Sequence, residues 1–471
     1  MLIWKTQTLN VNVASVRYRC LLPLRYLAKR GVNQTIFGGL DPVKITAQTE
    51  AIVFVKSFRD EDVETCEQAS SLGVPIILDL CDNIFIEEYA AGNDYVPARN
   101  FRQMVRRAAV VVTTGEALKK EIESAIAPLN VTIPIIIIPD GSETLSDIDD
   151  AFRTTRWQRL KSLVILPSIK RLLKPVNRLR RGLRVIALRV IYAVARRVFR
   201  ALCQTALCQG SPCLCPPYQL DPLQPFQPSQ SAKPSASLAS ANPPKPIANA
   251  KSIVQPTPWF PTNWPAAAPG TKTILWFGNH GAKYGSFGMS GILDVAEAIE
   301  RLSQEQPLRL VVVSNSRDKY EQYIEPLPFE TRYLRWHPRS IYDYIKASDV
   351  VIIPNSQSVY SICKSANRAV LSLSQGTPVV ASRTPALNLF EGCVILDAWE
   401  DGLRQYLLNP EIAQMHVALA QRAIAQTLSG DQIAQQWLSV LGIVTNRVPA
   451  EPSSTEAHST AATPAEYGSH A

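Results

Sequence analysis

Residues 364–380 have the sequence KSANRAVLSLSQGTPVV, which combines a polar entry, an amphipathic helix, a tight turn and a buried strand. Ala366, Val370 and Leu373 recur at helical spacing, and Gly376 follows the helix, where glycine is a common terminator. Helix, glycine turn and apolar strand in this order are typical of proteins in which helices alternate with parallel strands. The stretch therefore predicts an α/β fold.

Two cations stand where this helix is predicted to begin. Lys364 and Arg368 lie in or beside its first turn, where the positive end of the helix dipole disfavours them. An anion bound there would reverse that cost, because free backbone N–H groups and two cations would all face it. The alternative is that both side chains simply extend into water.

Outward from this stretch, the first 145 residues also alternate strands and helices. Apolar strands are predicted at 52–55, 76–80, 108–113 and 135–138, with a weaker strand pattern at 2–13. Helices are predicted at 15–30, 60–72 and 115–126. Continuous apolar strands imply a parallel sheet covered on both faces, so residues 1–145 are predicted to form one Rossmann-like domain.

Polar residues follow two of these strands, where such sheets bind ligands. Asp79, Asp82 and Asn83 end the strand at 76–80, and Asp140 follows the strand at 135–138. Asp82 is our candidate for orienting or deprotonating an acceptor hydroxyl. The alternative is that Asp79 or Asp82 caps the following turn.

The net charge of +9 is concentrated in one segment. No Asp or Glu occurs from Ala151 to Leu220, whereas fifteen Lys or Arg lie between Arg153 and Arg200. On a helical wheel, residues 156–202 place basic and aliphatic side chains on opposite sides, as in helices that lie on anionic membrane surfaces. We predict a basic helical insertion over 151–205, with packing against a domain as the alternative. Nucleic-acid binding is disfavoured because aromatic stacking residues are nearly absent there.

Residues 206–270 have the composition of a linker. Fifteen of the 35 prolines lie between Pro212 and Pro269, and such a segment cannot bury a core. The tail at 446–471 is predicted to be disordered as well. The nine cysteines include a cluster between Cys203 and Cys215 whose spacing does not match a zinc site, and palmitoylation of Cys203 and Cys208 is a further hypothesis. The odd number of cysteines and the lack of a secretory signal indicate a reducing cytoplasm.

A second Rossmann-like domain is predicted over 271–443. Its first strand, 273–277, leads into the loop GNHGAKYGSFGMSG, whose glycines and Lys283 suit a phosphate, although a merely flexible loop is the alternative. Polar residues at the predicted strand ends and the glycine turn would line one rim, which suits a nucleotide. They are Gly278, Asn279, Ser314, Asn315, Trp336, Asn355, Ser365, Asn367, Gly376 and Thr377.

The order ILWFGN, LVVVSNS, SDVVIIPN and KSANR…LSQGTPVVAS resembles the carboxyl-terminal domain of GT-B glycosyltransferases. VRYR, ILDLCDN and IIIIPDG resemble their amino-terminal domain, so the similarity covers roughly residues 10–145 and 271–443. It implies two Rossmann-like domains facing across a cleft, with a nucleoside diphosphate sugar on the second and an acceptor on the first. By motif position, Lys364, Ser365 and Arg368 correspond to donor-contacting groups.

The chain also departs from this family. Many retaining members carry two glutamates before the glycine turn, and here those places hold Cys363 and Leu371, which leaves the retaining branch in question. Asp147-Ile-Asp149 matches a metal-binding DxD but is expected in a loop, as an accidental match. The fold implies no obligatory metal or other cofactor.

These observations predict a glycosyltransferase in which Asp82, Lys364 and Arg368 are the catalytic residues. Cations and helix-end amides would stabilise the charge on the leaving diphosphate. A lipid-linked or polysaccharide acceptor at the inner face of the plasma membrane would explain the basic insertion. The alternatives are a catalytically silent nucleotide- or sugar-binding protein with the same fold, or a GT-B nucleotide-sugar epimerase.

Overall fold

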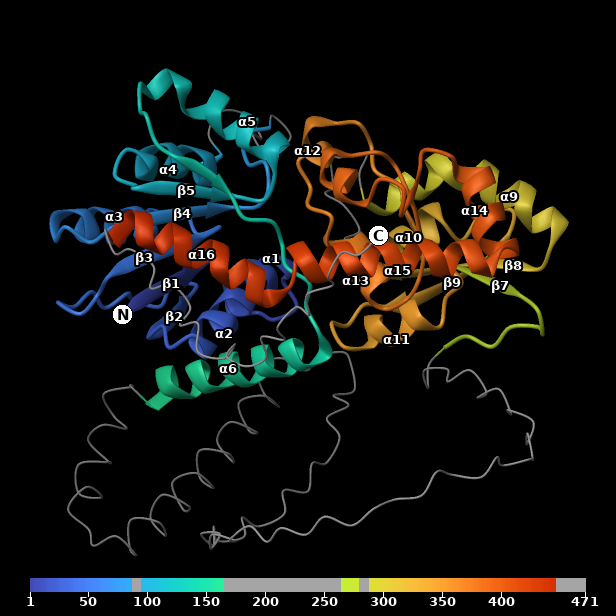
Figure 1. The fold of residues 1–471 in the computed structure, drawn as a ribbon, viewed down its shortest axis with the longest axis horizontal. Coiled ribbons are helices and arrows are strands. Elements are labelled where there is room, and N and C mark those ends of the chain that lie inside the picture. The colour runs from blue at the N-terminus through green and yellow to red at the C-terminus, as the bar shows by residue number, and fades with distance from the viewer. Residues whose placement is uncertain (87–94, 165–263, 279–287, 446–471) are drawn as a thin grey trace, which may run out of the picture. The chain divides into compact units, whose positions relative to one another are not determined.

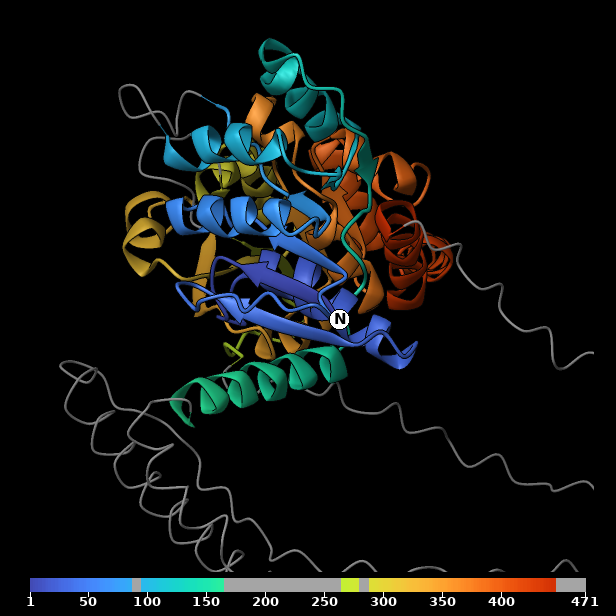
Figure 2. The same cartoon turned by 90° about the vertical axis from the view of Figure 1, so that its left-hand side faces the viewer.

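A computed structural model describes residues 1–86, 95–164, 264–278 and 288–445 of the chain (Figures 1 and 2). Within these ranges the strands form two six-stranded sheets, and the paired strands in both are parallel. The predicted α/β class with two Rossmann-like domains is confirmed. The predicted linker and tail lie almost entirely outside the described residues, as does most of the basic insertion.

The first sheet has the strand order β2-β1-β3-β4-β5-β6. Its strands are β1 (Leu2–Thr6), β2 (Gln34–Gly38), β3 (Ala51–Val55), β4 (Ile76–Leu80), β5 (Val110–Thr113) and β6 (Ile135–Ile137). The helices in this part of the chain are α1 (Ala14–Val16), the π-helix η1 (Arg17–Leu21), α2 (Leu22–Lys29), α3 (Asp60–Ser71), α4 (Val96–Val105), α5 (Glu116–Ile126), the 3-10 helix η3 (Ala127–Leu129) and α6 (Leu145–Val164). Along β3, Val53 packs into one core while Ile52 and Phe54 pack into another. Burial on both faces explains the continuous apolar strands.

The second sheet has the strand order β12-β11-β10-β7-β8-β9. Its strands are β7 (Lys272–Phe277), β8 (Leu308–Ser314), β9 (Glu330–Arg335), β10 (Val350–Ile353), β11 (Val379–Ala381) and β12 (Ile395–Leu396). The helices are η4 (Gly288–Val295), α9 (Ala296–Glu305), α10 (Arg317–Tyr323), α11 (Ser340–Lys346), α12 (Val359–Ile362), α13 (Asn367–Ser374), η5 (Pro385–Phe390), α14 (Trp399–Leu408), α15 (Pro410–Thr427) and α16 (Gly430–Thr445).

The last helix returns to the first sheet. α16, in red in Figure 1, follows α15 directly along the chain, yet its buried residues belong to a core of β1 and β3. The Trp437 ring meets Trp4 edge-on, with 5.0 Å between the centroids. Residues near the end of the predicted 271–443 domain therefore complete the core of the first one.

The helix predicted over 15–30 is interrupted by a π-helical turn. All five residues of η1 are buried, including Arg17 and Arg19, which are two positions apart. The wider π turn lets both arginines enter the interior, and such turns are frequent at functional sites.

α6 crosses the boundary expected near residue 145 as one continuous helix, in green in Figure 2. Thr144 and Asp147 bond reciprocally at its start, with Thr144 N donating to Asp147 Oδ2 at 2.8 Å. The expectation that Asp147 lies in a loop is therefore wrong, because this carboxylate caps the first turn of a helix. No helix in the described part of the chain is both long and apolar enough to cross a bilayer.

Candidate functional site

Asp82 and Lys364, predicted independently in different domains, meet in the structure. Asp82 follows β4, Lys364 lies in the turn between α12 and α13, and the Lys364 ammonium binds Asp82 Oδ1. Lys364 Nζ also donates to Tyr360 Oη at 2.6 Å. The contact brings a strand end of the first sheet to the helix start that the sequence singles out.

A second lysine shares the same carboxylate. Lys56, directly after β3, binds Asp82 Oδ2. Burial alone would raise the pKa of Asp82, but Lys364 and Lys56 outweigh it and hold that pKa well below its usual range. Asp82 is therefore an ionised carboxylate that both lysines hydrogen-bond, and this makes it a weak base.

Lys56 adopts an unusual backbone conformation for a residue other than glycine. Its φ of 46° is in the left-handed region, and its N–H donates to Asp79 O at 2.9 Å. Such conformations cluster at functional sites. Nothing in the local sequence marks this residue, and the sequence analysis missed it.

A buried ionic chain lies beside this cluster. Arg19 donates from Nε and Nη2 to the two oxygens of Asp79, at 3.1 and 2.6 Å, and from Nη1 to Asp140 Oδ1 at 3.3 Å. Ser365 Oγ donates to the other oxygen of Asp140 at 2.6 Å. The strand ends of the first sheet thus hold the Lys364–Ser365 turn at two points. Asp79 is an ion-pair partner of Arg19 and does not cap the following turn.

The start of α13 carries a cation with a neutral partner. Arg368 Nη2 donates to Asn355 Oδ1 at 2.8 Å, and no carboxylate in the described ranges pairs with it. Burial lowers the pKa of Arg368 to about 10. Ala366, at the N-cap, offers no side-chain acceptor to the free N–H groups of the first turn. Arg368, Asn355 and Gly278 lie together, since a Cβ at Gly278 would stand 3.4 Å from Arg368 Nη1.

The other predicted rim residues lie in different places. Ser314 ends β8 as a fully buried residue whose hydroxyl has no hydrogen-bond partner, and Asn315 follows it in an exposed position. Trp336 follows β9 and is half-buried, with the Arg17 guanidinium 5.5 Å from its ring centroid. Asn367 opens α13 beside Arg368. Asn279 and Lys283 lie outside the described residues.

Gly376 and Thr377 do not belong to this rim, so that part of the prediction is wrong. The turn precedes β11, which runs parallel to β10, and therefore lies at the amino edge of the sheet. Thr377 Oγ1 donates to Ile345 O at 2.8 Å, at the end of α11. Gly376, with φ of 91°, terminates α13 as the sequence predicts. These residues have a structural role.

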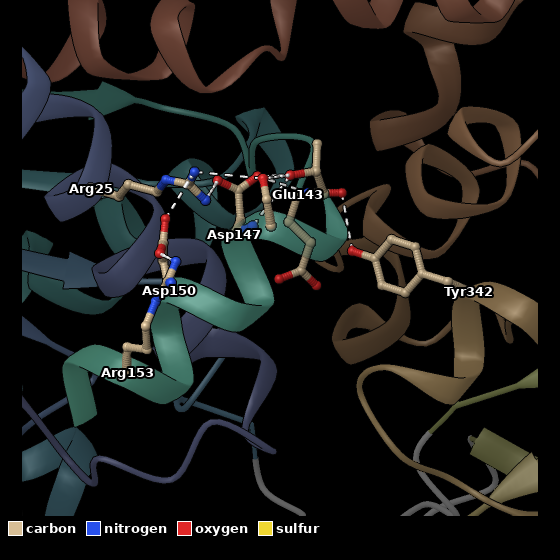
Figure 3. A network of polar contacts seen from close by, with 8 residues as sticks. Arg25, Glu143, Asp147, Asp150, Arg153 and Tyr342 are labelled. Carbon is tan, nitrogen blue, oxygen red and sulfur yellow. Dashed lines mark hydrogen bonds and ion pairs between the residues drawn. The ribbon is translucent and has the colours of Figure 1, made fainter. Parts of the chain in front are cut away.

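A second ionic cluster surrounds the start of α6 (Figure 3). Glu143 accepts from Arg17 Nε at 3.1 and 3.0 Å, and its backbone carbonyl accepts from Tyr342 Oη at 3.1 Å. Figure 3 shows the Tyr342 hydroxyl directed at this carbonyl, while the Glu143 carboxylate points elsewhere. Glu143 thus holds the Arg17 guanidinium, which contacts the Trp336 ring. The VRYR motif signalled Arg17, but not its buried partner.

Both aspartates of the DxD match form ion pairs with arginines. Asp147 pairs with Arg25, and Asp149 pairs with Arg339. Across the described ranges, no group of three or more His, Cys, Asp or Glu is arranged to hold a metal ion.

No protein-family model matches the chain, and no curated protein matches it in sequence. Among solved structures it is similar to Anabaena HepE in complex with UDP and glucose, at 12% identity and a TM-score of 0.47, covering 94% of this chain and 99% of that one. It is also similar to a glycosyltransferase from Rickettsia africae, at 10% identity and a TM-score of 0.48, covering 95% and 99%.

A third similar structure is S. aureus MnaA with UDP, at 8% identity and a TM-score of 0.43, covering 96% of this chain and 98% of that one.

Proposed function

We propose that this protein transfers a sugar from a nucleoside diphosphate sugar to a hydroxyl acceptor. The observation that carries the proposal is the start of α13, where the half-buried Arg368 has no carboxylate partner in the described ranges and the first turn lacks a side-chain cap. Withdrawing a cation partly from water without a counter-charge is costly, and a bound diphosphate would supply that charge. Lys364, close by, adds a second cation.

The proposed reaction needs positive charge at this place. The bond between the sugar's anomeric carbon and the diphosphate oxygen breaks, and its electron pair leaves with the diphosphate. The acceptor oxygen bonds to the anomeric carbon, and its proton passes to the leaving diphosphate oxygen or, in an inverting reaction, to a carboxylate base. Arg368, Lys364 and the N–H groups of α13 would stabilise the leaving charge without an obligatory metal or other cofactor. Gly278 leaves room beside Arg368, and Asn355 orients the guanidinium.

Asp82 has a defined place in this proposal. In an inverting reaction it would accept the proton of the acceptor, whereas its depressed pKa makes it a weak base. We therefore assign Asp82 first to the positioning of Lys364. The acceptor, a glycan or a lipid-linked sugar, would lie against the first domain.

A thermal-shift panel of UDP, GDP, ADP and CDP, with their sugars, tests the donor site. One nucleotide should raise the melting temperature of the wild type by several degrees, because it binds only the folded state. Lys364→Ala with Arg368→Ala should abolish the shift. The matched control, Lys120→Ala with Arg301→Ala, changes exposed residues on α5 and α9 and should keep it. No shift with any nucleotide, in folded wild-type protein, contradicts the proposal.

A second candidate is a silent nucleotide-binding protein, which is favoured because two lysines occupy the carboxylate of Asp82. Release of free nucleoside diphosphate from the sugar donor in the presence of acceptors separates the two candidates. Conversion of the donor without any acceptor would indicate the epimerase.

The basic insertion belongs to the proposal as a membrane contact. Residues 156–202 would hold the enzyme at an anionic surface on the cytoplasmic side, beside a lipid-linked acceptor. The full chain should float with vesicles containing phosphatidylglycerol and not with phosphatidylcholine vesicles. Equal behaviour with both kinds of vesicle excludes this part of the proposal.

A further inference from the structure

One carboxylate with two ammonium groups leaves the cluster of Lys56, Asp82 and Lys364 with a net charge of +1. The three side chains are partly exposed, at 30%, 18% and 33% respectively. They come from two neighbouring strand ends of the first sheet and from the turn before α13. A single lysine would neutralise the charge of Asp82. The second lysine is therefore not needed for charge balance unless Lys364 leaves Asp82.

Lys56 is held in place for this contact by its backbone. Its left-handed φ is maintained by the hydrogen bond from its N–H to Asp79 O, on the strand that leads to Asp82. Tyr95 also interacts electrostatically with Lys56 and Asp82, and Tyr360 interacts with Lys56. Lys56 belongs to the first domain and binds Asp82 Oδ2, whereas Lys364 binds Asp82 Oδ1.

This inference rests on the proposed function, in which two anions compete for Lys364: the Asp82 carboxylate and the donor diphosphate. Lys364 binds Asp82 in the structure, and in the proposed function it would also bind the donor diphosphate. The stronger its pairing with Asp82, the weaker its contribution to the donor. Lys56, which binds the same carboxylate, therefore affects donor affinity from outside the donor site.

We infer that Lys56 is a positioning residue for donor binding: by sharing Asp82 it weakens the hold of that carboxylate on Lys364. When the diphosphate takes Lys364, Lys56 remains as the counter-ion of Asp82. Without Lys56, release of Lys364 would leave a half-buried carboxylate without a cation. The donor would then bind against that penalty.

A double-mutant cycle tests this with dissociation constants of the four nucleoside diphosphates, measured by calorimetry. Lys56→Met should weaken binding about threefold to tenfold, and Lys56→Arg should restore it. Asp82→Asn should strengthen binding, because Lys364 loses its competitor. With Asp82→Asn in place, adding Lys56→Met should change affinity less than about twofold. A role of Lys56 in overall structure alone would not give this dependence on Asp82.

Each remaining outcome overturns the inference in a recognisable way. Equal weakening by Lys56→Met in both backgrounds would mean that Lys56 attracts the nucleotide directly. Unchanged or tighter binding in Lys56→Met alone would exclude the competition, while the proposed function would stand. No binding to wild type would refute both. If Asp82→Asn does not fold, Lys364→Met replaces it, and Lys56→Met must lose its effect there too.

Discussion

The Asp82 carboxylate links the electrostatics of the site to the stability of the fold. Its pKa in the folded protein lies below the ordinary value of 3.8, because Lys364 and Lys56 outweigh the effect of burial. Its ion pairs therefore stabilise the fold above that ordinary value, and the stabilisation is lost as pH falls toward the folded pKa. We expect Asp82→Asn to lose about 1–3 kcal/mol at neutral pH.

The pH dependence identifies this effect. The difference in unfolding free energy between wild type and Asp82→Asn should shrink from about pH 5 downward. Urea titrations at several pH values would measure it. Glu123→Gln, at an exposed position on α5, is the matched control and should follow the wild-type curve. A difference that stays constant with pH would mean that Asp82 contributes packing rather than charge.

At the scale of elements, strands buried on both faces were predictable, because continuous apolar runs leave a clear pattern. β4 and β7 lie where the sequence predicts strands, at 76–80 and 273–277. β2 was missed because only Ile36 and Gly38 of this edge strand are buried. Asp82 and Lys364 were predicted, but their pairing joins positions 282 residues apart, which no local pattern encodes. The left-handed backbone of Lys56 was not predicted either, because its N–H bonds to Asp79 O on another strand.

The junction between α15 and α16 offers a prediction at this scale. Gly430 opens α16 against Tyr26 of α2, and a Cβ there would stand 2.3 Å from the tyrosine ring. Gly430→Ala should cost about 1–3 kcal/mol of stability, because overpacking forces helix or ring to move. Denaturant unfolding would measure it. The loss should be smaller when Tyr26→Ala is already present, and Gly115→Ala, at an unobstructed position, is the control. Additive losses would show that the ring is not the obstacle.

At the scale of the whole molecule, α16 makes the first sheet depend on the end of the chain. Trp437 is fully buried against Trp4, in the core of β1 and β3, whereas α15 packs against α13 in the other half. Trp437→Ala should therefore destabilise the first sheet by about 3–5 kcal/mol and spare the second. Scanning calorimetry should show one transition in the wild type and an added early transition in the variant.

Adding a nucleotide identifies which half of the molecule gives rise to each calorimetric transition of the variant. Because the proposed donor site centres on α13 and the second sheet, a bound nucleoside diphosphate should raise the later transition of Trp437→Ala more than the early one. Trp399→Ala removes a half-buried tryptophan from the second core and is the matched comparison. There the nucleotide-sensitive transition should become the earlier one. If both variants melt in a single step, the two halves unfold as one unit. In that case the contacts of Asp82 and Asp140 with the turn before α13 couple the halves more strongly than α16 does.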